Sequence, residues 1–335
     1  MEQKIKVSII IPVYCVSAYI ERCIKSIMNQ TYHNIECIIV NDATLDDSIV
    51  KCMDFINEYQ GPIQFLILHH DKNRGLSAAR NTGTCAATGD FIFYIDSDDA
   101  ITQDCIEKLV RPVFSDSGIE MVMGSFVRES DGYQITPRQQ QGKILEENNY
   151  KSRDAVRDCY FKYKLYPNAW NKLIKKDFLF RNQLFFREGI LWEDILWFFY
   201  VMKYLSHLYT LQDVTYIQYK RPRSITTGIS QERKAYYIGL VYEDISNHFT
   251  MGEEAREVKS LLRDFCELCV QTSDNDSYHR AARQFRKVLS DGKHKSELML
   301  LLVTVFLSKS FMGRKIYRRA FAFYSAVIFK IRSCR

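Results

Sequence analysis

Glycine and proline are scarce in this sequence, with 14 and 6 among 335 residues. Such low numbers exclude a collagen-like or low-complexity chain, and 47% hydrophobic residues supply enough apolar surface for a large core. The length exceeds one typical domain and falls short of three. We therefore expect one main domain with an appended helical piece.

A strong excess of one charge is also missing. The 46 Lys and Arg against 40 Asp and Glu leave a net charge of +6, which predicts no nucleic-acid partner but allows a local basic patch. No apolar signal sequence precedes the first predicted strand. The 10 cysteines are irregularly spaced, and Cys266 and Cys269 have no second pair at zinc-finger spacing. We expect a reduced, cytoplasmic protein.

Short apolar runs alternate with amphipathic stretches along the N-terminal third of the chain. This alternation predicts a parallel α/β sheet with helices on both faces. In such sheets ligands bind beyond the carboxyl ends of the strands. Strands are expected at residues 7–12, 35–40, 63–68 and 91–95, and helices at 18–30, 46–59, 76–87 and 102–114.

The regular alternation stops after a further apolar run at residues 119–127. The polar segment 128–149 is expected to be a long loop or a hairpin, and residues 150–224 mix helical and strand patterns. From residue 231 the pattern is helical. We predict a boundary near residue 228, with a main domain at 1–228, divided into halves at 1–100 and 101–228, and a helical C-terminal extension at 229–335.

An aromatic residue and a carboxylate are expected at the same edge of the sheet. The first strand ends in Pro12, Val13 and Tyr14, and the second is followed by Asp42. A carboxylate can accept a hydrogen bond from a pyrimidine imide, and an aromatic ring can cover the base. The alternative is that Asp42 and Thr44 only form a turn and cap the next helix.

A cluster of acids follows the fourth strand, where Asp96, Asp98 and Asp99 lie within four residues. Carboxylates this close repel one another unless a cation neutralises them, and a set of oxygen ligands suits Mg²⁺ or Mn²⁺. Such a metal would stabilise a departing phosphorylated group. An ordinary acid-rich capped turn is the alternative.

Two further segments carry charged residues. Arg74 and Arg80 lie at the start of a helix rich in small residues, where they could contact phosphate or form an internal ion pair with the acids. Glu193 and Asp194 precede an apolar helix. They are either a favourable helix N-terminus or a general base that deprotonates an acceptor hydroxyl.

These motifs occur in an order that resembles the large inverting glycosyltransferase family two, with its Rossmann-like GT-A fold. The resemblance runs from about Lys6 to Ser224 and is most specific between Asn73 and Asp99, with an Asn-x-Gly-x-x-x-Ala-Arg-Asn block and the acidic cluster in register. It implies an enzyme of bacterial surface-polysaccharide assembly, with residues 1–100 as the nucleotide-sugar-binding half of the main domain and residues 101–228 as its acceptor-side half.

The resemblance also implies residue roles. Asp194, or Glu193 beside it, would be the catalytic base. The segment Trp170–Leu173 resembles the family's region before that pair, and the segment after Tyr219 resembles a basic stretch that contacts the diphosphate. The implied nucleotide-binding residues are Pro12, Val13, Tyr14, Asp42, Arg74 and Asp96, the metal ligands Asp98 and Asp96, and the diphosphate contacts Lys220 and Arg221.

The chain departs from the family pattern at the second strand, where Asn41 replaces the usual first acid and Ala43 and Leu45 replace Gly and Thr. Because Asp42 remains, a UDP-sugar is the expected donor, with guanosine and thymidine donors left open.

The C-terminal tail combines a short apolar run, residues 297–307, with aromatic and basic residues at 316–331. The run is too short to span a bilayer, which needs about 20 residues. A helix lying on an anionic membrane surface is one interpretation, and a packing appendage with a solvated basic face is the other.

Together these patterns predict transfer of a sugar from a nucleotide diphosphate donor to a glycan or lipid-linked acceptor, with Mn²⁺ or Mg²⁺ as cofactor. A cytoplasmic location at the inner face of the membrane would suit such an acceptor. Two alternatives remain, a non-catalytic sugar-nucleotide-binding scaffold and a sugar nucleotidyltransferase. The latter typically has a glycine-rich basic loop where this chain has Pro12–Cys15.

Overall fold

The computed structural model describes residues 5–130, 133–137, 145–163 and 165–220, with a few single positions between 233 and 245. The chain divides after Ser224 into two compact units, and the described ranges fall within the first. Apart from those single positions, the predicted extension at 229–335, with its cysteine pair and its tail, lies outside the described residues. Its helical character remains a prediction.

Four parallel strands form the N-terminal part of the sheet, as the alternating pattern predicts. Their order is β3-β2-β1-β4, with Val13 opposite Asn41 and Ile10 opposite Tyr94. Every residue of β1 is buried, which accounts for its unbroken apolar sequence. The strands are β1 Val7–Val13, β2 Ile35–Asn41, β3 Gln64–His69 and β4 Phe91–Tyr94.

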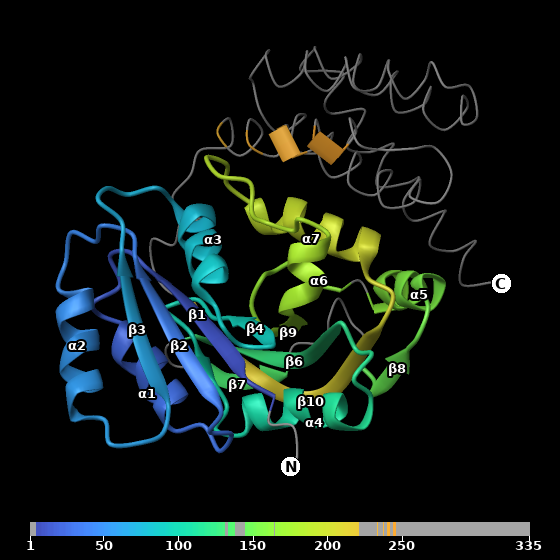
Figure 1. The fold of residues 1–335 in the computed structure, drawn as a ribbon, viewed down its shortest axis with the longest axis horizontal. Coiled ribbons are helices and arrows are strands. Elements are labelled where there is room, and N and C mark those ends of the chain that lie inside the picture. Colours follow the sequence, from blue (N-terminus) through green and yellow to red (C-terminus); the bar gives the residue numbers. More distant parts are fainter. Residues whose placement is uncertain are drawn as a thin grey trace. The chain divides into compact units, whose positions relative to one another are not determined.

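Helices cover both faces of these strands (Figure 1). Alternate residues of β1 point to opposite faces, so Ile9 packs with α1 and α2 while Ile10 packs with α3. The α3 helix approaches β1 closely at Gly83, where an added Cβ would lie 2.5 Å from the Ile10 side chain. The helices are α1 Ile20–Met28, α2 Ser48–Glu58 and α3 Leu76–Ala86.

The sheet becomes mixed beyond β4. The β9 strand is antiparallel to both β4 and β6, and β10 is parallel to β6. The polar segment that follows residue 127 begins as a hairpin of β6 and β7, one of its two predicted forms. The elements are β5 Ala100–Ile101, α4 Cys105–Ser115, β6 Met121–Ser130, β7 Tyr133–Pro137, β8 Asn148–Tyr150, α5 Arg153–Tyr163, β9 Lys172–Lys175, α6 Lys176–Arg181, α7 Glu193–Tyr204 and β10 Leu208–Tyr219.

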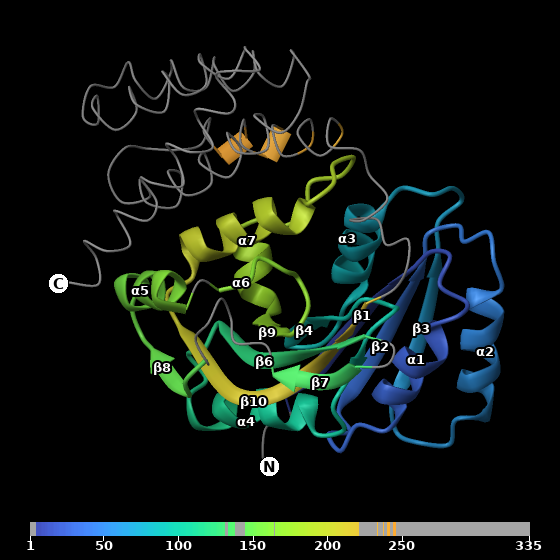
Figure 2. The same ribbon diagram turned by 180° about the vertical axis from the view of Figure 1, so that it is seen from behind.

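Two hydrophobic clusters fill the two sides of the sheet. The α4 helix shares one cluster with α1 and α2, and α5, α6 and α7 share the other with α3 (Figure 2). The predicted α/β class with a largely parallel sheet between helices is therefore confirmed. In the part of the chain that the structure describes, no helix has the length and apolar character needed to cross a bilayer.

Candidate active site

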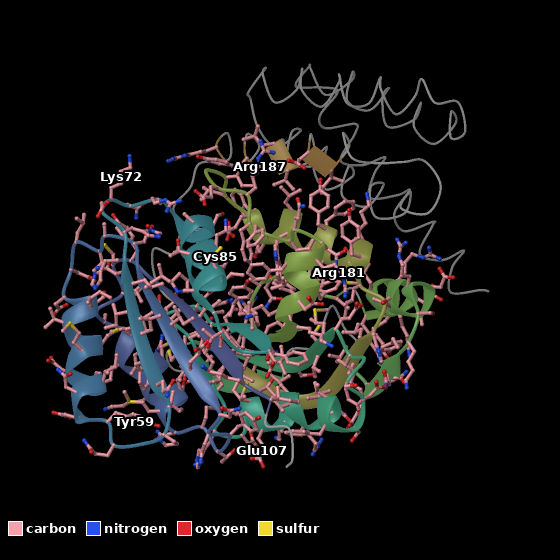
Figure 3. The ribbon with its side chains drawn as sticks, in the orientation of Figure 1. Tyr59, Lys72, Cys85, Glu107, Arg181 and Arg187 are labelled. Carbon is pink, nitrogen blue, oxygen red and sulfur yellow. The ribbon has the colours of Figure 1, made fainter. Side chains whose placement is uncertain are left out.

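The carboxyl ends of β1, β2 and β4 meet at one edge of the sheet because these strands are parallel neighbours. Lys72, in the loop after β3, lies at this edge, and Tyr59, at the end of α2, lies at the opposite one (Figure 3). The residues that follow the three strands are therefore neighbours in space, as the sequence predicts.

Asp42 follows β2 and is 3% exposed. Its carboxylate accepts hydrogen bonds from the backbone N–H groups of Arg74 and Gly75, both at 2.8 Å, and lies 2.7 Å from the His70 ring nitrogen. Gly75 has a φ of +87°, a conformation that favours glycine. Asp42 thus holds the loop before α3, and only part of its acceptor capacity is left for a base.

The end of β1 offers mainly one side chain to a ligand. Pro12 and Val13 are buried in the core, whereas Tyr14 is 41% exposed at the rim. An aromatic ring at this place can cover a base. Of the three predicted contacts from this strand, only Tyr14 therefore presents its side chain at the surface.

Asp46 holds the loop after β2 through hydrogen bonds. The sequence patterns did not single out this residue. Its carboxylate accepts hydrogen bonds from the N–H groups of Ser17 and Ser48 and from the Thr44 hydroxyl. Although burial acts to raise the pKa of Asp46, these hydrogen bonds hold it well below its ordinary value. An Asp two residues before a helix start was the available signal.

The acidic turn after β4 contains Asp96, Asp98 and Asp99, whose potential ligand oxygens all lie within 4.8 Å of one another. Asp99 is 2% exposed and accepts hydrogen bonds from the Tyr216 hydroxyl at 2.7 Å and the Tyr219 N–H at 2.9 Å. The other two acids are partly exposed. The turn is thus anchored by its last acid and presents the first two.

The acidic turn fits a divalent cation. Burial raises the pKa of Asp99 well above its ordinary value, and the charges of Asp98 and Asp96 add to this. A cation would offset that repulsion, and a donor set made only of carboxylate oxygens is what Mg²⁺ and Mn²⁺ prefer. Because Asp99 is buried and accepts hydrogen bonds from two tyrosines, the partly exposed Asp98 and Asp96 are the candidate ligands.

Arg80 on α3 connects the acidic turn to the acidic pair of α7. Its Nη1 lies 2.7 Å from Glu193 and its Nη2 lies 2.9 Å from Asp96, while the side chain is almost fully buried. Of the two roles left open by the sequence, the structure shows the internal ion pair. Residues 113 positions apart in the chain are thereby brought to one place.

Replacing Arg80 with Met is expected to lower the free energy of unfolding by about 3–5 kcal/mol, because the buried Glu193 carboxylate would lose its partner. Denaturant unfolding measures this change. The matched control is Arg111→Met at an exposed position of α4, for which we expect a change within about 0.5 kcal/mol. Equal stability of the two variants would contradict the structural role of Arg80.

Asp194 differs from its neighbour Glu193 in having no arginine partner among the ion pairs of the described residues. Burial raises its pKa from 3.8 to about 7, with Glu193 adding to the shift and Arg80 opposing it. Trp192, just before the helix, has a φ of +58°, which costs conformational energy. An acid that is half-ionised near neutral pH can take a proton from a substrate hydroxyl.

Residues at the start of β9 and just before it contact the tyrosine that anchors the acidic turn. Lys172 is fully buried, and its Nζ donates to the backbone oxygens of Asn168 at 2.6 Å and Trp170 at 3.4 Å. The Trp170 ring stacks on Tyr216, the tyrosine that holds the turn, at a centroid distance of 4.3 Å. The sequence singled out Trp170–Leu173 only through its resemblance to the family's region before the acidic pair, and it did not predict the contact with Tyr216.

Two basic candidates lie at the rim. Arg74 is half-exposed and lies 3.2 Å from the Glu188 carboxylate, so it joins the loop before α3 to the loop before α7. Lys220 is exposed just after β10, with its backbone N–H bonded to Glu129. Arg221 lies outside the described residues. Contacts of these side chains with a nucleotide or diphosphate remain predictions.

Residues 8–178 match the sequence profile described as Glycosyl transferase family 2, which is just over half of the 335 residues. The chain therefore belongs to this family, in agreement with the resemblance seen in its motifs.

Curated relatives agree with this assignment. GlyA, a glycosyltransferase of Streptococcus pneumoniae, is 34% identical over 199 residues, which cover 56% of this chain and 27% of GlyA. EpsH of Bacillus subtilis is 32% identical over 180 residues, covering 54% of this chain and 50% of EpsH. GgaB of Bacillus subtilis, a minor teichoic acid biosynthesis protein, is 35% identical over 106 residues, covering 31% and 11%. The chain thus spans half or less of these relatives.

Solved structures confirm the predicted GT-A fold. The first 349 residues of TarS from Staphylococcus aureus, in complex with UDP-GlcNAc, superpose with a TM-score of 0.67 at 15% identity, covering 95% of this chain and 91% of that one. PcManGT, a mannosyltransferase from Pyrobaculum calidifontis in complex with GDP-Man and Mn²⁺, gives 0.57 at 16% identity, covering 97% and 87%.

Proposed function

We propose that this chain is a metal-dependent inverting glycosyltransferase that moves a hexose or N-acetylhexosamine from a nucleotide diphosphate sugar to a glycan or lipid-linked acceptor. One observation carries the proposal. Arg80 pairs with both Asp96 and Glu193, so that a candidate cation site and a candidate proton acceptor share one edge of the sheet. Membership of glycosyl transferase family 2 supports the same reaction class.

The donor would lie across the carboxyl ends of β1, β2 and β4. Tyr14 would cover the base, and Asp42 would accept its imide N–H with the acceptor capacity left after holding the Arg74 loop. Arg74, Lys220 and Arg221 would contact the phosphates. The TarS structure contains UDP-GlcNAc, which supports a UDP-sugar as the donor. PcManGT contains GDP-Man, so the fold also accepts a guanosine nucleotide.

A divalent cation held by Asp98 and Asp96 would supply Lewis-acid stabilisation of the departing nucleotide diphosphate. The other chemistry belongs to Asp194, which removes the proton of the acceptor hydroxyl as that oxygen attacks the anomeric carbon. Attack from the face opposite the leaving group inverts the anomeric centre. Arg80 keeps Glu193 fixed in an ion pair, which leaves Asp194 as the base of the acidic pair.

The acceptor is proposed to be a growing surface polysaccharide or its lipid-linked precursor. GgaB, whose name assigns it to teichoic acid biosynthesis, supports a surface polymer. Such an acceptor would place the protein at the inner face of the cell membrane, through the basic and aromatic tail. Binding of the full chain to anionic vesicles, compared with a chain that ends at Ser224, tests this placement.

A panel of nucleotide sugars tests the proposed reaction. With Mn²⁺ present, we expect one UDP-sugar to release UDP faster than the others, and chelation of the metal should stop this release. Release of pyrophosphate from UTP and a sugar phosphate would indicate a nucleotidyltransferase instead. Binding of a nucleotide sugar without any diphosphate release, with or without candidate acceptors, would indicate a scaffold.

A further inference from the structure

Arg22 on α1 makes contacts that serve neither the binding of a sugar nucleotide nor an ion pair. Its Nε and Nη2 both donate to the backbone oxygen of Asp98, at 3.1 and 2.5 Å. Its guanidinium carbon lies 3.7 Å from the centre of the Tyr219 ring and 5.3 Å from that of the Tyr19 ring. A guanidinium that lies over an aromatic ring and donates two hydrogen bonds to one oxygen has little freedom to turn, so the direction of both N–H donors is fixed.

These contacts link Arg22, the acidic turn and Tyr219 to one another. Arg22 bonds to the carbonyl of Asp98, Asp99 accepts the backbone N–H of Tyr219 at 2.9 Å, and the Tyr219 ring lies against Arg22. The turn is therefore held at consecutive residues, once by its backbone and once by a side chain. Neither of these two contacts is made by the carboxylate of Asp98, which is the proposed ligand.

The end of α1, together with Gln30 just after it, holds the chain that follows the turn. Gln30 donates to the backbone oxygen of Thr102 at 2.7 Å, and the Ser26 hydroxyl accepts from the backbone N–H of Ile101 at 3.2 Å. Arg22, Ser26 and Gln30, on α1 and just after it, thus hydrogen-bond the backbone between Asp98 and Thr102. The helix provides a rigid base for the acidic turn.

We propose that Arg22 is a positioning residue for the cation site, which fixes the backbone of Asp98 so that its carboxylate and that of Asp96 face the same cation. This inference rests on the proposed metal-dependent function. Arginine has no acceptor atom and cannot be a ligand itself. Groups that orient metal ligands without touching the metal commonly change its affinity by large factors.

The charge of Arg22 and its positioning role predict opposite changes in cation affinity when Arg22 is replaced. A guanidinium close to the site repels a divalent cation, so its removal would strengthen binding if charge alone mattered. Loss of the two hydrogen bonds to Asp98 would instead weaken binding, because the ligand would no longer be held in place. The sign of the change in affinity therefore separates the two roles.

The experiment is a titration of the full chain with Mn²⁺ in the presence of UDP, with free Mn²⁺ measured by electron paramagnetic resonance. We expect Arg22→Gln to weaken Mn²⁺ binding by about 10-fold or more. Arg22→Lys keeps the charge but lacks the planar fork, and it should also weaken binding. The control is Lys25→Gln, an exposed position of the same helix that pairs only with Glu21 among the described ion pairs, and it should leave the affinity unchanged.

Unchanged or tighter Mn²⁺ binding by Arg22→Gln, with normal binding by the wild type, would overturn the inference and leave the proposed function standing. A wild type that binds no Mn²⁺ would overturn both. Should Arg22→Gln fail to fold, Tyr219→Leu decides the question, since it removes the stacked ring but keeps the backbone N–H to Asp99. Weaker Mn²⁺ binding by this variant supports the inference, and unchanged binding overturns it.

Discussion

Asp98→Asn is expected to reduce turnover by at least about 100-fold, because a neutral amide replaces the carboxylate that would hold the cation against the leaving diphosphate. Asp98 is partly exposed, and the turn is anchored through the buried carboxylate of Asp99. The thermal unfolding temperature should therefore stay close to that of the wild type. Release of the nucleotide diphosphate and Mn²⁺ affinity are the two measurements.

The matched control for this variant is Asp54→Asn, at an exposed position of α2. It removes the same charge and should leave both turnover and Mn²⁺ affinity unchanged. If Asp98→Asn keeps most of the wild-type turnover, the assignment of Asp98 as a metal ligand is wrong. If it loses turnover but binds Mn²⁺ normally, Asp98 acts in some way other than by holding the cation.

Asp194→Asn is expected to lower turnover by about 10²- to 10⁴-fold, the usual contribution of a general base. In the wild type, turnover should rise with pH through about 7 and then level, since only the ionised carboxylate accepts a proton and its pKa is raised to about 7. The variant should lose this pH dependence. Initial rates between pH 5 and 9 at saturating donor provide the measurement.

The same substitution should increase stability at alkaline pH. The pKa of Asp194 is raised from 3.8 to about 7 in the folded chain, so the folded state binds a proton more tightly than the unfolded state between these values. Its contribution to the stability of the wild type therefore falls as pH rises over this window. The amide introduced by the substitution does not ionise, so Asp194→Asn should unfold at a higher temperature than the wild type at pH 8.

Glu193→Gln provides the contrast to this variant. Glu193 is 6% exposed and pairs with Arg80, so its neutralisation should lower stability by leaving a buried guanidinium with only Asp96. Loss of stability in Glu193→Gln and loss of turnover in Asp194→Asn would separate the structural acid from the catalytic one. A pH-dependent rate that persists in Asp194→Asn would contradict the assignment of the base.

The N-terminal half of the main domain, residues 1–100, could be predicted from sequence because its signals are local. The buried parallel strands are continuous apolar runs, and the helices between them show a 3.6-residue period. The observed ends of β1, β2 and β3 lie within one residue of those expected. The position of the acidic turn follows directly, since Asp96 must come after the central strand β4.

The second half of the main domain, which begins at residue 101, could be predicted only in outline. Insertion of β9 between β4 and β6 depends on strand pairing far along the chain, which no local pattern encodes. The sequence also did not show that Asp42 is largely used by the loop at Arg74 and Gly75. Likewise, it left the role of Arg80 open, because its partner Glu193 lies on a distant helix.

The Arg80 bridge has a consequence for how the protein is made. A nascent chain that has not yet produced α7 lacks Glu193, and one that ends before β10 lacks the two tyrosines that anchor Asp99. In either case the acids after β4 have no fixed arrangement in which to share a cation. Under the proposed function, sugar transfer is therefore expected only after synthesis has passed Tyr219, so that unfinished chains would not consume the donor.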